Sequence, residues 1–527
     1  MQTLRRTVAV LTFPAIAYLG AACEDTPTAF KAVRPISAVA YGSPDRWVNA
    51  LDPTPSPPGT SCSDAGYMTI SAAVVAANPG DVIQVCPALY GEQVMITKTL
   101  TLLGAKVGVD ARTRPPPLPT VESIIDHPCG PVQIEANNVV LDGFTVQGSI
   151  LPDPCFLAGI WSNPGFTGTQ GGHTILNNIV QNNISGIELD SDCTFPTLVQ
   201  FNLIQNNDNP GPGSGNAIQT NFGLCKATVD NNKFSGHTNS SVLVVVPSSN
   251  LDVTNNELVG GSGGARIVFA SVSTGTISGN VSMSSIAMNG TIRLFGGNSN
   301  VTINSNTLLS GVRGIRVDDP FGVGINSGIE GHFNCIQGNT IAGLQVDAGG
   351  HSGTLNAENN WWGSSTGPAN PNNPGGTGDA VIAPDNNVDF IPFLPSPPGP
   401  PCPAPPLPPS GKVTGGGQID VTGGVGSFGF NAKLENGAAS GHLSYLNHAT
   451  RAQLDCQVMA FTELTAMTAK FSGTCSLPKS AAGSFMAEVE DHGNPGKGND
   501  KFKITYGSNT DGSSVTTIRS GNIEIHK

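Results

Sequence analysis

Two similar stretches in the middle of the chain carry the residues best suited to chemistry. "GIRVDDP" at 314–320 and "GLQVDAGGH" at 343–351 contain the candidate site residues Arg316, Asp318, Asp319, Gln345, Asp347 and His351. If Ile315 and Val317 point into a core, the alternation along a strand turns Arg316 and Asp318 outward. If the two stretches are adjacent strands, Asp318 and Asp347 lie about 4.8 Å apart.

Two carboxylates at that separation either share a proton or bind a cation such as Ca²⁺, and a nearby arginine can act as a base or hold an anionic substrate. Arg316, Asp318 and Asp347 are therefore the candidate catalytic residues. Asp319, Gln345 and His351 are candidate binding residues beside them. The alternative is that an aspartate at the end of a strand simply forms a turn, which requires no substrate.

The elements that position these residues are predicted by a repeat. "LNNIVQNNISGIELD" at 176–190 reads as two short strands joined by asparagine-rich corners, because its apolar residues recur every second position and Asn and Gly form helices poorly. Similar motifs follow at steps near 24 residues. The last asparagines of these motifs are Asn178, Asn202, Asn232, Asn256, Asn280, Asn306, Asn339 and Asn360.

A repeat this short cannot bury its own apolar face, so successive repeats must stack as parallel strands of a solenoid. Asparagine tolerates the left-handed conformation of a sharp corner, and its amide both donates and accepts hydrogen bonds. We therefore expect the asparagines to form a ladder along the solenoid axis. A second acidic group, Glu188, Asp190 and Asp192, then lies about five coils, or 24 Å, from Asp318.

One segment resembles a known family. "YMTISAAVVAANPGDVIQVCPALYGEQVMITKTLTLLGA" at 67–105 looks like the first coils of right-handed parallel β-helix proteins of the pectin-lyase-like superfamily, with "SAAVVAAN" as a capping helix. "NNVVLDGFTV" at 137–146 and "ENNWWGSSTGP" at 358–368 are similar to later family segments. The resemblance implies a right-handed parallel β-helix over 60–393. It also implies that Trp361 and Trp362 pack at the end of the solenoid, although they could stack on a sugar.

The first residues read as an export signal. "MQTLRR" is basic, an apolar run follows, and "LGAAC" resembles a bacterial lipobox with Cys23 as the lipidated residue. We expect a signal segment over 1–23 and a disordered tether over 24–59. Ordinary secretion, with Cys23 unmodified, is the alternative.

The remaining ten cysteines are even in number and lack zinc-like spacing, so disulfides in an oxidising compartment are predicted. Connectivity stays open at this point. Proximity along the chain suggests the pairs Cys62 with Cys86, Cys129 with Cys155, Cys193 with Cys225, Cys456 with Cys475, and Cys335 with Cys402.

Residues 394–411 form a proline-rich linker. In residues 412–527, apolar and polar side chains alternate strictly in stretches separated by Gly and Asn-Gly turns, which predicts an antiparallel β-sandwich or barrel. That segment resembles a β module of secreted bacterial surface proteins. Its Asp491, Asn494, Asn499 and Asp500 offer oxygen ligands without the spacing of an EF-hand.

Composition limits the function. The net charge is −13 and lysine and arginine clusters are missing from the sequence, so a nucleic-acid partner is excluded. The chain is predicted to be an exported, lipid-anchored surface protein that binds glycan or a matrix component without catalysis and without a required cofactor. The alternative is a polysaccharide lyase or glycoside hydrolase acting in a groove on the β-helix.

Overall fold

The computed structural model describes residues 40–526 except 153–154, 156, 164–169, 261–262, 403–409, 436–437, 466, 478–479 and 514–516. The chain divides into two units, Met1–Cys402 and Pro403–Lys527. The predicted signal segment, Cys23 and the first part of the predicted tether lie outside the described residues. Within the described part, no helix is long and apolar enough to cross a membrane.

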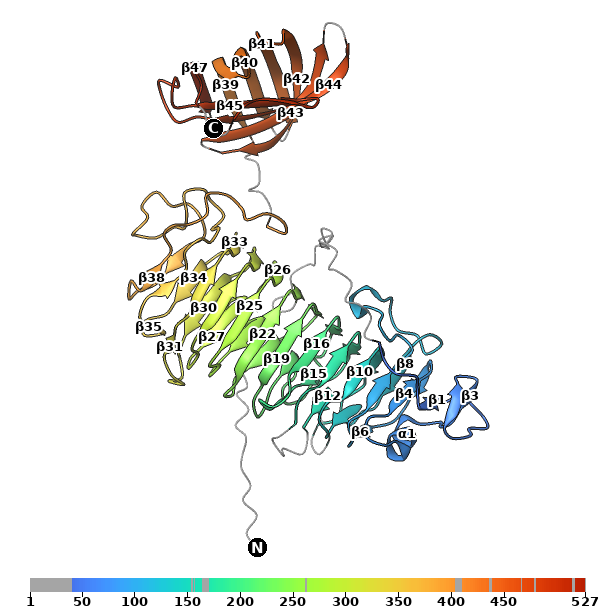
Figure 1. The fold of residues 1–527 in the computed structure, drawn as a ribbon. Helices are drawn as coiled ribbons and strands as arrows, with labels where there is room; N and C mark the ends of the chain where they lie inside the picture. The colour runs from blue at the N-terminus through green and yellow to red at the C-terminus, as the bar shows by residue number, and fades with distance from the viewer. Residues whose placement is uncertain are drawn as a thin grey trace. The chain divides into compact units, whose positions relative to one another are not determined.

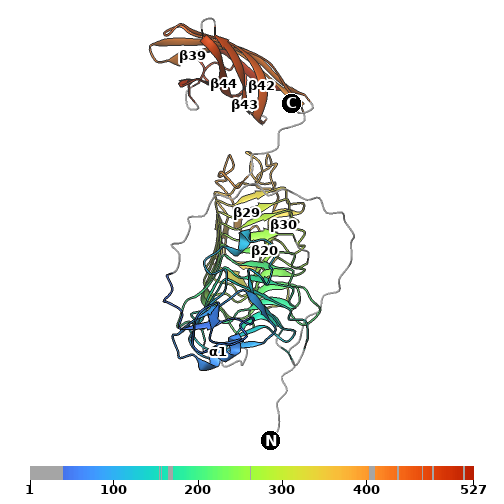
Figure 2. The ribbon, with the colours of Figure 1, turned by 90° about the vertical axis from the view of Figure 1, so that its right-hand side faces the viewer.

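The first unit is a parallel β-helix, as the sequence predicted (Figures 1 and 2). A typical coil contributes one strand to each of three long parallel sheets, so most neighbours in a sheet are three strands apart along the chain. Sheet 1 has 13 strands. They are β1 (Arg46–Val48), β4 (Val82–Val85), β7 (Thr101–Leu103), β10 (Val140–Asp142), β13 (Thr174–Leu176), β16 (Thr197–Gln200), β19 (Cys225–Asp230), β22 (Ser249–Thr254), β25 (Gly275–Ser278), β28 (Val301–Asn304), β32 (Glu330–His332), β36 (Leu355–Asn356) and β38 (Val388–Asp389).

Sheet 2 has 10 strands and sheet 3 has 11. The strands of sheet 2 are β5 (Ala88–Tyr90), β8 (Ser123–Asp126), β11 (Phe144–Gln147), β14 (Ile179–Gln181), β17 (Leu203–Gln205), β20 (Lys233–Ser235), β23 (Glu257–Val259), β26 (Val281–Met283), β29 (Thr307–Leu309) and β33 (Cys335–Gln337). Those of sheet 3 are β6 (Val94–Ile96), β9 (Val132–Ile134), β12 (Ala158–Ser162), β15 (Ser185–Glu188), β18 (Asn216–Gln219), β21 (Ser240–Val244), β24 (Ile267–Phe269), β27 (Ile292–Phe295), β30 (Arg313–Asp318), β34 (Ala342–Val346) and β37 (Val381–Ile382).

The interior of the solenoid is a single apolar core built from alternate strand residues. Because one inward residue of each strand stacks on that of the next coil, the core consists of columns. The inward column of sheet 3 contains Ile160, Ile187, Ile218, Val242, Ile267, Ile292, Ile315 and Leu344. Every second residue of these strands therefore faces outward, which is what positions the candidate site.

The corners between sheets 1 and 2 show why asparagines come in pairs. The first residue of the pair takes a positive φ, as at Asn177 (51°) and Asn231 (52°). The second is the buried ladder residue. In each step of the ladder, the side-chain oxygen of one asparagine accepts two hydrogen bonds from the asparagine of the preceding coil. Asn256 Oδ1, for example, accepts from the backbone N–H of Asn232 at 2.9 Å and from its side-chain amide at 3.1 Å.

The ladder confirms all but one of the predicted asparagines. Asn306 donates to Asn334, and Asn334 donates to Asn360, so the predicted Asn339 is not a member. Asn334 immediately precedes β33, whereas Asn339 follows β33 and lies at the next corner, where it contacts Asp379. The prediction was wrong because the motif's last asparagine was assumed to hold the same place in every coil.

The N-terminal end is capped by helix α1 (Ile70–Ala76), which confirms the predicted cap. Ile70, Ala73 and Val74 pack into the core, and Thr69 caps the helix by accepting from the N–H of Ala72. The first coil begins before the predicted boundary at residue 60, because β1 pairs with β4 in sheet 1. A short hairpin of β2 (Gly59–Ser61) and β3 (Asp64–Ala65) and the 3₁₀ helix η1 (Ala111–Thr113) lie outside the three sheets, as does the pair β31 (Asn326–Ser327) and β35 (His351–Ser352).

The second unit is one curled antiparallel sheet of nine strands around its own aromatic core. This is nearer to the predicted barrel than to a sandwich of two sheets. Its strands are β39 (Ser410–Val421), β40 (Gly424–Glu435), β41 (Ala438–Asn447), β42 (Ala452–Leu464), β43 (Thr468–Leu477), β44 (Ser480–Glu490), β45 (Lys501–Tyr506), β46 (Asn509–Gly512) and β47 (Ser520–His526).

All five predicted disulfides are present. They join Cys62 to Cys86, Cys129 to Cys155, Cys193 to Cys225, Cys335 to Cys402, and Cys456 to Cys475. Disulfides of this number fit an exported protein, because cytosolic thiols are kept reduced.

Candidate functional site

The candidate catalytic residues and Gln345 lie on the outer face of sheet 3, with Arg316 and Asp318 on β30, Gln345 on β34 and Asp347 directly after β34. Ile315 and Val317 belong to the core, so Arg316 and Asp318 of β30 face outward as predicted. The register pairs Arg316 with Arg293 of β27 on one side and with Gln345 of β34 on the other. Side chains from three coils are thereby brought into one group.

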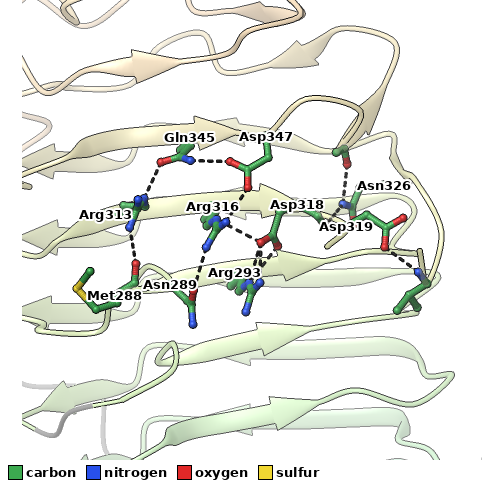
Figure 3. A network of polar contacts seen from close by, with 12 residues as sticks. Met288, Asn289, Arg293, Arg313, Arg316, Asp318, Asp319, Asn326, Gln345 and Asp347 are labelled. Atoms are coloured by element: carbon green, nitrogen blue, oxygen red, sulfur yellow. Dashed lines mark hydrogen bonds and ion pairs between the residues drawn. The ribbon is translucent and has the colours of Figure 1, made fainter. Parts of the chain in front are cut away.

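The centre of this group is a chain of ion pairs (Figure 3). Arg293 forms a bidentate contact with Asp318, with its Nη2 2.6 Å from Oδ2. Arg316 contacts two carboxylates, Asp318 at 3.2 Å and Asp347 at 2.6 Å. The two aspartates therefore lie on adjacent coils, as predicted, with Asp318 at the end of β30 and Asp347 directly after β34, and one arginine bridges them.

A third arginine, Arg313, lies at the start of β30. Its Nε donates to Gln345 Oε1 at 2.6 Å, and its Nη1 donates to the carbonyl of Met288. Among the described residues, its second terminal amino group has no hydrogen-bond partner. We call Arg293, Arg313, Arg316, Asp318 and Asp347 the arginine patch; it carries one positive charge in excess.

The two carboxylates differ in solvent exposure. The side chain of Asp318 is 1% exposed, whereas that of Asp347 is 31% exposed. Burial alone would raise the pKa of Asp347, but hydrogen bonds from Arg316 and Gln345 and the arginine charges outweigh it, so its pKa is lowered. Burial, followed by the charge of Arg316, lowers the pKa of Arg313. A carboxylate held ionised in this way is a poor proton donor.

Two predicted binding residues do not join the patch. Asp319 accepts hydrogen bonds from the N–H groups of Val323 at 2.7 Å and Gly324 at 3.2 Å, so it forms the turn after β30. His351 is buried in β35, where its ring contacts the carbonyl of Gly353 and the N–H of Ile329. Gln345 does join, because its amide links Arg313 to Asp347.

Arg293 and Arg313 were not predicted as site residues from the sequence. The signal for Arg293 was present, because "TIRLF" at 291–295 has the same alternation as "GIRVD" at 314–318 and aligns Arg293 with Arg316. It lacked an acidic residue and so did not stand out. Arg313 precedes the quoted motif and is identified only by its contacts.

Aromatic side chains flank the Asp318 side of the patch. The guanidinium of Arg293 lies 4.3 Å from the ring centroid of Phe295. Phe295 in turn meets Phe321 edge to face at 5.3 Å, and Phe321 is 56% exposed. An exposed ring beside cations is an arrangement that can hold the apolar face of a sugar.

The second acidic group is separate from the patch and largely structural. Four strands of sheet 3 lie between β15, which carries Glu188, and β30. Asp190 accepts from the N–H groups of Asn221 and Phe222 at 3.0 and 2.9 Å and so holds the turn after β18. Glu188 is 2% exposed, and burial raises its pKa to about 8 despite a hydrogen bond from Gln219.

Other candidates also have structural roles. Trp361 and Trp362 are buried at 1% and 0% exposure, which confirms end-of-solenoid packing. Asp491 and Asp500 accept from the N–H groups of Ile525 and Ile523 in the last strand. No three His, Cys, Asp or Glu side chains within the described ranges gather where they could hold a metal ion.

No protein-family model matches the chain, and no curated protein matches it. Among solved structures, an alginate lyase from Paenibacillus sp. str. FPU-7 is 12% identical, with a TM-score of 0.33, over 61% of this chain and 96% of that one. The A-module of the Azotobacter vinelandii mannuronan C-5 epimerase AlgE6 is 14% identical, with a TM-score of 0.31, over 62% and 93%.

Tailspike protein 2 of Escherichia coli O157:H7 bacteriophage CAB120 is 10% identical, with a TM-score of 0.31, over 87% of this chain and 66% of that one. The parallel β-helix of this chain is defined by its three long parallel sheets.

Proposed function

We propose that this chain is an exported surface protein whose β-helix binds an acidic polysaccharide at the arginine patch without cleaving it. The observation that carries the proposal is the convergence of Arg293, Arg313 and Arg316 on one outer face, with a free amino group on Arg313. Arginine is well suited to hold carboxylates, because its planar fork donates several hydrogen bonds at once.

The ion pairs argue for binding rather than proton transfer. Asp318 is contacted by two arginines and is almost inaccessible, and Asp347 is contacted by Arg316 and Gln345. A general acid or base must exchange its proton with the substrate, which requires a free carboxyl group with a pKa near the working pH. The aspartates instead orient the arginines.

Export and anchoring complete the proposal. The five disulfides support an oxidising compartment. The lipobox-like "LGAAC" supports a lipid anchor at Cys23. Mass spectrometry of the membrane fraction tests this point, because acylation would add mass to an N-terminal peptide that begins at Cys23.

The alternative function, a polysaccharide lyase or hydrolase, has one observation in its favour. The pKa of Arg313 is lowered by burial and by the charge of Arg316, which shifts this residue toward the neutral form that a base requires. In a lyase, Arg313 would abstract the proton on the carbon next to the carboxylate of a uronic acid, a carbon–carbon double bond would form, and the glycosidic oxygen would leave and take a proton from solvent.

The test is isothermal titration of the wild-type protein with alginate, polygalacturonate and a neutral glucan, with and without Ca²⁺. We expect binding of the acidic polymers only, weakening as salt rises. Arg313→Gln removes charged hydrogen bonds, so its Kd for the acidic polymers should rise about 10-fold or more. Arg112→Gln, which removes an arginine paired with Asp110 elsewhere on the solenoid, is the matched control.

Product analysis of the same mixtures separates the two functions. Unsaturated or newly reducing ends that disappear in Arg313→Gln would replace the binding proposal with the enzymatic one. Absence of binding to every acidic polymer, or equal loss in Arg112→Gln, would contradict a role for the patch.

A further inference from the structure

The outer face of sheet 3 ends in a hollow that lies next to the arginine patch. This open hollow has a volume of about 410 Å³. It lies at β37, the last strand of the sheet, and Asn370, Pro371, Ile382, Pro384 and Asn386 are among its lining residues. None of the nine residues that line it is charged.

The hollow continues the surface of the patch. Ile382 pairs with Gln345 across adjacent strands, and Gln345 pairs with Arg316. The three outward side chains therefore form one row along the solenoid axis, with steps of about 4.8 Å. Ile382 is 37% exposed, whereas its neighbour Val381 is buried in the core.

The lining is held in place by hydrogen bonds. Asn370 donates to the carbonyl of Val381 at 2.8 Å and accepts from the N–H of Asn372 at 2.8 Å. Asn372 also donates to Asn386 Oδ1 at 2.6 Å. Among the described residues, the amide NH₂ of Asn386 has no partner, so it can donate to a ligand hydroxyl. A preformed surface loses little conformational freedom when it binds.

We propose that this hollow is a second subsite for the same polysaccharide, which receives a sugar ring while carboxylates of neighbouring residues contact the arginines. The inference rests on the proposed function and extends it. Apolar walls of proline and isoleucine match the C–H face of a ring, and the amide rim matches its hydroxyls. The ligand must then lie along the solenoid axis and be longer than a single sugar.

The dependence of affinity on the length of the oligosaccharide tests the proposal directly. Purified oligomers of polygalacturonate and of alginate, from two to eight residues, are titrated into the full chain. For the wild type, we expect affinity to rise at least 10-fold between the shortest and the longest oligomer that binds. Ile382→Trp fills the hollow, so the ratio of the affinities for the longest and the shortest oligomer should fall to near one.

Two further variants make the result interpretable. Ile382→Ala enlarges the hollow without blocking it and should lower the ratio partly, which covers the case in which the tryptophan variant fails to fold. Val259→Trp alters a residue of matched exposure, 36%, on sheet 2 and should keep the wild-type ratio.

The outcomes separate the two proposals. Wild-type affinity that does not depend on length, or a ratio that is unchanged in both Ile382 variants, would overturn the subsite and leave the arginine patch intact. Failure of oligomers of every length to bind would overturn the proposed function and the subsite with it.

Discussion

At the scale of single residues, each corner asparagine pair divides two tasks between its members. Asn255 has a φ of 53°, and Asn256 is buried at 1% exposure. Asn256 donates to Val229 and Asn280 and accepts twice from Asn232. The first position therefore requires a permissive backbone, and the second requires an amide.

Replacing each member of this pair should have different effects. Asn256→Ala leaves buried polar groups of Val229 and Asn232 without partners, so the free energy of unfolding should fall by about 2–4 kcal/mol. Asn255→Gly keeps the left-handed corner and should change the free energy of unfolding by less than about 1 kcal/mol. Urea denaturation checks both, and a loss for Asn256→Ala no larger than that for Asn255→Gly would contradict this division of tasks.

This division explains what the sequence could and could not predict at the residue scale. Alternation correctly predicted that Arg316, Asp318 and Asp347 face outward, because Arg316 lies between two core residues and each aspartate directly follows one. Arg293 was missed because its motif carries no acidic residue, and its pairing with Arg316 depends on the register between coils. The same dependence moved the ladder from Asn339 to Asn334.

At the scale of elements, the last strand of the C-terminal sheet is a protected edge. Among the strands that the structure describes, β47 pairs only with β39. On its other side, Asp500 accepts from the N–H of Ile523 at 2.7 Å and Asp491 from that of Ile525 at 2.9 Å. Unpaired strand edges promote aggregation, and these carboxylates occupy two of the edge donors.

Removing one of these carboxylates should therefore increase self-association. Asp500→Ala frees the N–H of Ile523 and of His492, so we expect higher-order species at high protein concentration in light scattering after size exclusion. Asp420→Ala, at an exposed residue paired with Arg519, is the control and should stay monodisperse relative to wild type. Identical scattering by the two variants would mean that the edge is protected in another way.

The type of each structural element was more predictable from the sequence than its first and last residues. Periodicity near 24 residues indicated the coils, and Gly-rich alternation indicated the antiparallel sheet, since both patterns reflect local geometry. The predicted tether extended too far, because β1 belongs to sheet 1 through pairing with β4, a contact distant in sequence. The proline composition around residues 51–59 gave no sign of that pairing.

At the scale of the whole molecule, buried titratable groups in the solenoid should give its stability a maximum near neutral pH. His173 and His237 are fully buried, and burial lowers the pKa of each to about 4. In the unfolded chain these histidines titrate near 6.5, so below that pH the unfolded state binds more protons. Acid therefore favours unfolding, by on the order of 3 kcal/mol per histidine once pH reaches about 4.

Glu188 acts in the opposite direction. Burial raises its pKa to about 8, so the folded state keeps a proton that the unfolded state loses above about 4.5. The contribution of Glu188 to the free energy of unfolding is complete below about pH 4.5 and is lost as pH rises through about 8. From about pH 4.5 to 6.5 the two histidines outweigh the one glutamate, and above 6.5 only the glutamate changes. Among these three groups, the balance places the maximum near pH 6.5.

Urea midpoints of the solenoid transition at about pH 5, 6.5 and 8 test this balance. The wild-type midpoint should be highest at the middle pH. His173→Gln should reduce the loss on the acid side, and Glu188→Gln should reduce the loss on the alkaline side, because each removes one of the linked protons. His332→Gln replaces a partly exposed histidine at the end of β32 in the same solenoid and is the control variant. A wild-type midpoint that is equal at pH 5 and 6.5 would mean that the histidines are accessible to protons in the folded state, and therefore that the solenoid core opens locally at these coils.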